Sequence, residues 1–250
     1  MFVVKMALAL PLGILAGCGA VYVFNRLPAE WLCDYGEVPR EEKTQRISGV
    51  PWKGIFSAGF ACLWVHLCAT MSVQYSIAAL IVCWLLLMVA ISDRKYMIIP
   101  DQFVCFIAAC TIGLAPILGS YPQEIPQGLA PWGMLWKTFA MTDGQIIVAN
   151  QLGGAIVGGG IMLIVALVAK GISGREAMGF GDVKLMAAIG LATGIGGALF
   201  TLILSSLSAG VAAAIGLATK KVKPTDEKPL GPHICGAAIT YLFIVVPLMV

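Results

Sequence analysis

Charged residues are scarce in this sequence. They make up 12% of the 250 residues, whereas hydrophobic residues make up 59% and the mean hydropathy is +0.91. A water-soluble domain carries about 25% charged residues, so this chain has too little polar surface to cover a globule in water. The shortage excludes an ordinary soluble domain and indicates a membrane protein.

Stretches of alternating polar and apolar residues are also missing, and spanning β-strands would require them. The apolar residues instead form long runs, and the charged residues lie between the runs. This pattern is typical of membrane-spanning helices. We therefore predict an all-α fold, a polytopic bundle of transmembrane helices that forms one domain over residues 1–250.

No Cys-x-x-Cys pair occurs among the eight cysteines. Most of them lie within or at the ends of apolar runs, where a thiol is a small packing residue, and only Cys33 lies in a polar loop. This spacing favours neither a disulfide framework nor a zinc site. We expect no metal and no cofactor.

Eight helices are predicted, over residues 3–24, 54–72, 75–92, 102–118, 147–170, 183–193, 196–219 and 233–250. Basic residues gather in the connections 25–53, 93–101, 170–184 and 220–232. The connection 119–146 has only Lys137, and the turn near Ser72 has no basic residue. Because positive charge marks the cytoplasmic side, the four basic connections should be cytoplasmic, with both termini, the turn near Ser72 and the loop 119–146 outside.

The apolar stretch from Val183 to Leu217 is too long for one spanning helix. Glycines at 194, 196 and 197 favour a turn within it. A split there leaves the helix 183–193 only about 16 Å long at 1.5 Å per residue, against a hydrocarbon core of about 30 Å. We therefore expect irregular backbone at membrane depth beside a water-filled cavity near Gly179 to Asp182.

Three aspartates lie at the ends of predicted helices: Asp93, Asp101 and Asp182. An ionisable group at membrane depth is costly and is a functional candidate by default. Asp101 opens a helix, where capping alone explains an aspartate. Asp93 instead closes a helix, the unfavourable end for a negative charge. Asp182 follows a Gly-x-Gly that lets another backbone come close.

These aspartates lie in motifs that resemble those of the type IV prepilin peptidases, a branch of the GxGD membrane aspartyl proteases. Residues 93–101, DRKYMIIPD, look like the family's first aspartate motif, and residues 179–185, GFGDVKL, look like its second. Residues 230–232, LGP, resemble an element before the last helix, and residues 25–28, NRLP, resemble the family's start. The resemblance implies a GxGD-protease-like bundle.

Carried over position by position, Asp93 and Asp182 match the catalytic pair of that family. The residues expected to support the motifs or to bind substrate are Gly179, Gly181, Lys184, Pro100 and Asp101. Lys184 either steadies the charge of the pair or extends to the membrane interface, and the second interpretation is preferred.

The resemblance implies an aspartic endopeptidase in the bacterial cytoplasmic membrane, with its active site facing the cytoplasm. Its substrates would be type IV prepilins or pseudopilins, whose short basic leader is removed at the membrane edge. The lipid bilayer is the other expected partner, and no nucleic acid is expected. Many members carry two Cys-x-x-Cys pairs in the first cytoplasmic loop and N-methylate the cleaved pilin. Here the loop 25–53 has only Cys33, which argues against metal binding and against methylation.

Two other classes of protein remain open. One is a different GxGD protease that cuts signal-peptide remnants or general membrane segments. The other is a transporter or channel that uses the two aspartates as an ion site, although the inverted repeats common in such folds are not visible here.

Overall fold

The computed structural model describes residues 2–33, 47, 49–118, 143–173, 179–220 and 228–249. Over these residues the chain is helical, which confirms the predicted all-α fold class. The helices long and apolar enough to cross a membrane are Gly49–Thr70, Val73–Tyr96, Gly144–Ile172, Phe180–Ala218 and Gly231–Leu248. Two shorter apolar helices, Ala9–Phe24 and Asp101–Leu114, accompany them.

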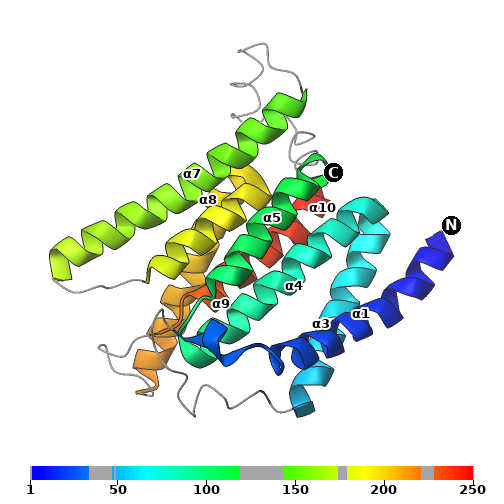
Figure 1. Cartoon of the computed structure of the whole chain (residues 1–250), viewed down its shortest axis with the longest axis horizontal. Helices are drawn as coiled ribbons and strands as arrows, with labels where there is room; N and C mark the ends of the chain where they lie inside the picture. The colour runs from blue at the N-terminus through cyan, green and yellow to red at the C-terminus, as the bar shows by residue number, and fades with distance from the viewer. Residues whose placement is uncertain are drawn as a thin grey trace.

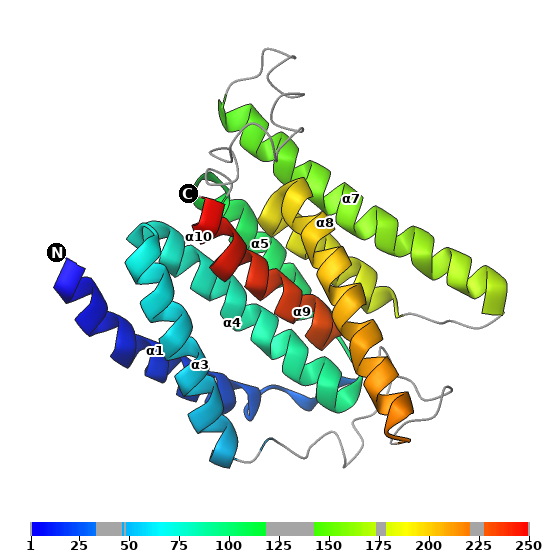
Figure 2. The ribbon, with the colours of Figure 1, turned by 180° about the vertical axis from the view of Figure 1, so that it is seen from behind.

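The helices form a bundle whose centre is α4 (Val73–Tyr96) and α9 (Gly231–Thr240), as Figures 1 and 2 show. On one side, α1 (Phe2–Phe24) packs along α3 (Gly49–Thr70). On the other side, α7 (Asp143–Ser173) packs along α8 (Phe180–Ala218). The remaining elements are η1 (Ala29–Leu32), α5 (Asp101–Leu118), the π-helical turn η3 (Tyr241–Val245) and α10 (Val246–Met249).

The end of α4 differs from the prediction in a way that matters for Asp93. The helix continues to Tyr96, four residues beyond the predicted end at residue 92. Met97 closes it in the left-handed conformation (φ 55°), with its N–H donating to the Asp93 carbonyl at 2.8 Å. Such a left-handed residue is a common helix terminator. Asp93 therefore lies inside the last turn of α4 and not beyond it.

Parts of both predicted long loops are helical. In the loop predicted at 25–53, η1 forms a short turn and α3 starts at Gly49, ahead of the predicted start at residue 54. In the loop predicted at 119–146, α7 starts at Asp143. Residues 34–46, 48 and 119–142 of these loops lie outside the described residues.

The predicted break in the long apolar stretch is confirmed at Gly194, where α8 reverses direction (Figure 2). A side chain at Gly158 of α7 would lie 2.9 Å from the Met186 carbonyl and 3.4 Å from the Ala198 side chain. A straight helix would separate residues 186 and 198 by about 18 Å. The two halves of α8 therefore lie side by side against α7, and the first half begins at Phe180 and not at the predicted residue 183.

Candidate active site

Asp93 and Asp182 come from different helices and approach one another inside the bundle. Asp93 lies in the last turn of α4 and Asp182 in the first turn of α8, and their exposed fractions are 6% and 9%. Their carboxyl groups lie within electrostatic range of one another. The thiol of Cys235, one turn into α9, is fully buried and lies within electrostatic range of both. The fold thus brings together the two residues that the sequence selected.

The Asp93 side chain is held by the start of α9. The Gly231 N–H donates to Asp93 Oδ2 at 2.8 Å, in a buried contact between residues far apart in the chain. An N–H in the first turn of a helix has no partner within the helix, and it lies at the positive end of the helix dipole. This contact offsets the unfavourable position of a carboxylate at the end of α4.

Glycine is required at position 231 by the same contact. A Cβ atom there would lie 2.7 Å from Asp93 Oδ2 and 3.0 Å from Asp93 Cγ. Two residues further on, His233 Nδ1 forms a 3.1 Å hydrogen bond with Ser208 Oγ, which ties the start of α9 to the returning half of α8. The Leu230-Gly231-Pro232 element of the sequence indicates no role for Gly231, because only the fold brings this residue to Asp93.

Asp182 has a different environment. Its backbone N–H donates to the Gly179 carbonyl at 3.2 Å, where α8 begins. Its side-chain atom Oδ1 is buried and has no hydrogen-bond partner among the described residues. A buried carboxyl oxygen without a partner is destabilising, so stability alone does not explain Asp182. The position therefore supports a functional role for this side chain.

The segment between Asp93 and α5 packs against the start of α8, which carries Asp182, through the contact of Ile99 with Gly181. Ser92 Oγ donates to the Ile98 carbonyl at 2.9 Å, which fixes the turn after Met97. The Pro100 carbonyl accepts the first backbone bonds of α5. Between them, Ile99 packs on Gly181, where a Cβ atom would lie 3.1 Å from Ile99 Cβ. Glycine at position 181 thus allows this close approach, and Pro100 lies directly before α5.

Lys184 and Asp101 form an ion pair that was not predicted from the sequence. The Lys184 ammonium donates to both carboxylate oxygens of Asp101, at 2.9 and 2.7 Å. The two side chains are 38% and 25% exposed, respectively. Lys184 also lies over the ring of Phe180, 5.3 Å from its centroid. The ammonium is therefore held by Asp101, and the expectation that it extends to the membrane interface stays a prediction.

Gly179 differs from the other glycines of the site. It precedes α8 in an extended conformation (φ −70°, ψ 141°) that any residue can adopt. A Cβ atom there would meet only the Gly181 nitrogen, at 4.0 Å. No neighbour in the described structure therefore requires a glycine at 179, so its expected role in binding a substrate backbone stays a prediction.

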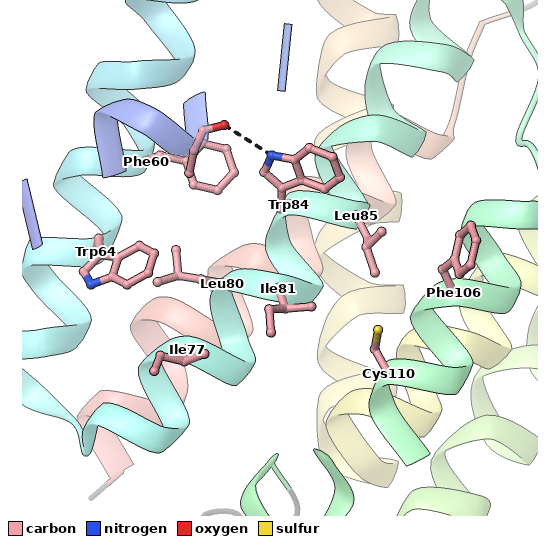
Figure 3. Close-up of a pocket in the computed structure, with 10 residues that line it drawn as sticks. Phe60, Trp64, Ile77, Leu80, Ile81, Trp84, Leu85, Phe106 and Cys110 are labelled. Atoms are coloured by element: carbon pink, nitrogen blue, oxygen red, sulfur yellow. Dashed lines mark hydrogen bonds between the residues drawn. The ribbon is translucent and has the colours of Figure 1, made fainter. Parts of the chain in front are cut away.

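An apolar groove of about 400 Å³ lies elsewhere, between α1, α3, α4 and α5 (Figure 3). Its lining on α4 includes Ile77, Ile81 and Trp84, and Phe106 contributes from α5. At 3.6 residues per turn, Asp93 points about 160° away from Ile77 around α4. The helix therefore separates this groove from the two aspartates, and the water-filled cavity expected near Gly179 to Asp182 stays a prediction.

No group of three or more His, Cys, Asp or Glu side chains in the described ranges can hold a metal ion. Cys33 bonds locally, since its thiol donates to the Ala29 carbonyl at 3.2 Å. Residues 34–46 of the first polar loop lie outside those ranges. The expectation that the protein uses no metal and no cofactor therefore stays a prediction.

Comparison with known proteins gives the same family that the motifs resemble. Residues 79–215 match the model of the type IV leader peptidase family. Proteins named prepilin leader peptidase/N-methyltransferase from Aeromonas salmonicida and Aeromonas hydrophila are 28% identical over 160 residues, which is 64% of this chain and 46% of theirs. A protein of that name from Xanthomonas campestris is 36% identical over 90 residues, 36% of this chain and 31% of its own.

The chain spans about half the length, 46%, of the curated Aeromonas relatives it matches. No solved structure matches it. The family match nevertheless covers more than half of the chain and includes Asp93, Asp101, Asp182 and Lys184. The chain therefore belongs to the type IV leader peptidase family.

Proposed function

We propose that this protein is a membrane aspartic endopeptidase that removes the short basic leader from type IV prepilins or pseudopilins. The observation that carries the proposal is the buried, electrostatically coupled pair of Asp93 and Asp182, brought together from two helices. Membership of the leader peptidase family supports the substrate class. The curated relatives, which this chain covers only in part, are named for this peptidase activity and also for an N-methyltransferase activity.

Two neighbouring carboxyl groups suit peptide hydrolysis because both cannot ionise without strong repulsion, so they share one proton. The ionised carboxylate takes a proton from water as the water oxygen attacks the scissile carbonyl carbon. The neutral carboxyl donates a hydrogen bond, and then its proton, to the carbonyl oxygen. When the tetrahedral intermediate collapses, the C–N bond breaks and the amine leaves with a proton from the pair. The two aspartates titrate as a unit.

The contacts of the site support this mechanism. The Gly231 N–H stabilises the Asp93 carboxylate in its ionised form and fixes its orientation. Asp182 Oδ1 is buried without a hydrogen-bond partner within the described part of the chain, so it is available to a water molecule or a scissile carbonyl. Placement of both groups before substrate arrives lowers the reorganisation that the reaction requires.

The membrane topology supports a cut at the cytoplasmic edge. The connection 93–101 and the approach to Asp182 both belong to the basic segments predicted to face the cytoplasm. A prepilin with a basic leader and an apolar helix would place its leader in the cytoplasm and its helix in the bilayer. We further propose that residues 1–250 act as a single peptidase domain without methyltransferase activity, since the loop 25–53 has no Cys-x-x-Cys pair.

Replacement of each aspartate by asparagine tests the proposal. Asp93→Asn and Asp182→Asn keep the side-chain size and remove the acid, so each should reduce prepilin cleavage in isolated membranes at least about a thousandfold. Glu30→Gln is the matched control, because the Glu30 side chain is exposed on the η1 turn and should be dispensable. Cleavage at the wild-type rate by either aspartate variant would sink the proposed function.

A further inference from the structure

The ion pair between Asp101 and Lys184 joins two chain segments that lie next in sequence to Asp93 and Asp182. Lys184 follows Asp182 by two residues, within the first turns of α8. Asp101 is the first residue of α5 and follows the turn that leaves Asp93. With two contacts, at 2.9 and 2.7 Å, the pair joins the starts of α5 and α8. It therefore connects the segment that follows Asp93 to the helix that carries Asp182.

A second contact runs parallel to the ion pair. Ile99 packs closely on Gly181, where an added Cβ atom would lie 3.1 Å from Ile99 Cβ. The turn is fixed on its other side by the hydrogen bonds from Ser92 to Ile98 and from Met97 to Asp93. Residues 97–101 thus form a strap with one end anchored on α4 and the other on α8. Movement of this strap would change the separation of the Asp93 and Asp182 carboxyl groups.

Charge offers a competing explanation for Asp101. A carboxylate at the cytoplasmic end of the bundle would attract a basic leader, and Asp101 would then bind substrate. In the structure both of its oxygens accept bonds from Lys184, which neutralises the local charge. A neutral pair attracts a basic leader weakly. The geometry therefore favours positioning over leader recognition.

We propose that the Asp101–Lys184 ion pair is a positioning device that sets the distance between Asp93 and Asp182, and that neither residue of the pair recognises the leader. The proposal rests on the proposed peptidase function. Small displacements of reacting groups can cost up to about a hundredfold in rate. Loss of the pair should therefore reduce kcat and leave KM for prepilin unchanged.

Four variants of the full chain test this role. Asp101→Asn and Lys184→Gln should each reduce kcat by about tenfold to a hundredfold, with unchanged KM. Lys184→Arg should retain most activity, because a guanidinium also binds both oxygens of a carboxylate. The double variant Asp101→Lys/Lys184→Asp should recover part of the loss. Lys228→Gln, which removes an exposed cation before α9, is the matched control and should behave as wild type.

The outcomes separate the two explanations. A raised KM with unchanged kcat would assign Asp101 to leader binding and overturn the proposal, as would wild-type kinetics in both single variants. Failure of the charge-swapped protein to exceed the single variants would also contradict it. Hydrogen–deuterium exchange adds a readout that needs no substrate: the backbone amides of residues 97–99, 101 and 179–184 should exchange faster in both single variants and recover in the charge-swapped protein. If the wild-type protein cleaved no prepilin, the peptidase function would fail, while the exchange result would still report on the strap.

Discussion

The glycines near the two aspartates differ in what a side chain at each position would contact. Gly231 touches the Asp93 carboxylate directly, and Gly181 makes room for Ile99. Among the described residues, a Cβ atom at Gly179 would meet only the Gly181 nitrogen, at 4.0 Å, and the expected role of Gly179 in substrate binding stays a prediction. Sequence motifs identify all three positions but cannot assign these contacts, because the partners of Gly231 and Gly181 are distant in the chain.

At the scale of single residues, we expect Gly231→Ala to reduce prepilin cleavage without unfolding the protein. The added Cβ would lie 2.7 Å from Asp93 Oδ2, so either the carboxylate or the start of α9 must move. We expect prepilin cleavage to fall by about tenfold or more, while the protein remains folded in detergent. Gly236→Ala is the matched control on the same helix, because no atom of the described residues lies within 4 Å of a Cβ atom there. Equal activity of the two variants would show that the Gly231 contact is dispensable.

Among the secondary-structure elements, α8 is unusual because it reverses direction at Gly194. Gly194 has φ 70° and ψ −175°, a conformation essentially restricted to glycine. The side chain of Asn150 on α7 lies against it, and Asn150 Oδ1 accepts the Ile195 N–H at 3.3 Å. One α7 side chain thus satisfies a backbone donor at the start of the returning helix. In an apolar surrounding, such a donor would otherwise be unpaired.

Gly194→Ala should therefore destabilise the fold by about 2 kcal/mol or more, because a Cβ atom is strained at this backbone conformation and also meets Asn150. Asn150→Ala should cost about 1–3 kcal/mol by leaving the Ile195 N–H unpaired. Denaturant unfolding of the purified protein in mixed micelles measures both changes. Gly196→Ala, where a Cβ atom would lie 3.8 Å from the Tyr241 hydroxyl, should shift stability by less. A stability loss of Gly194→Ala no larger than that of Gly196→Ala would contradict the role of the turn.

At the scale of the whole molecule, hydropathy and glycine placement predicted the helices and the break in α8, because lipid forces apolar residues into long unbroken runs. Helix ends were less predictable. The helix α4 continues past Asp93 to Tyr96 and ends where Met97 adopts a left-handed conformation, which a methionine in the sequence does not predict. The contacts of the site were least predictable. The partners in Gly231–Asp93, Ile99–Gly181 and Asp101–Lys184 are far apart in sequence, and only the assembled bundle brings them together.

The orientation of the bundle in the membrane gives a prediction for the whole molecule. Basic residues before α9 should lie in the cytoplasm, whereas the turn between α3 and α4 should lie outside. In a protein whose native cysteines are replaced, Lys228→Cys should react with a membrane-impermeant maleimide only in inside-out vesicles. Val73→Cys, at the exposed start of α4, should react only in right-side-out vesicles. The opposite pattern would place the two aspartates on the wrong side for a basic leader held in the cytoplasm, and the proposed cut at that membrane edge would fail with it.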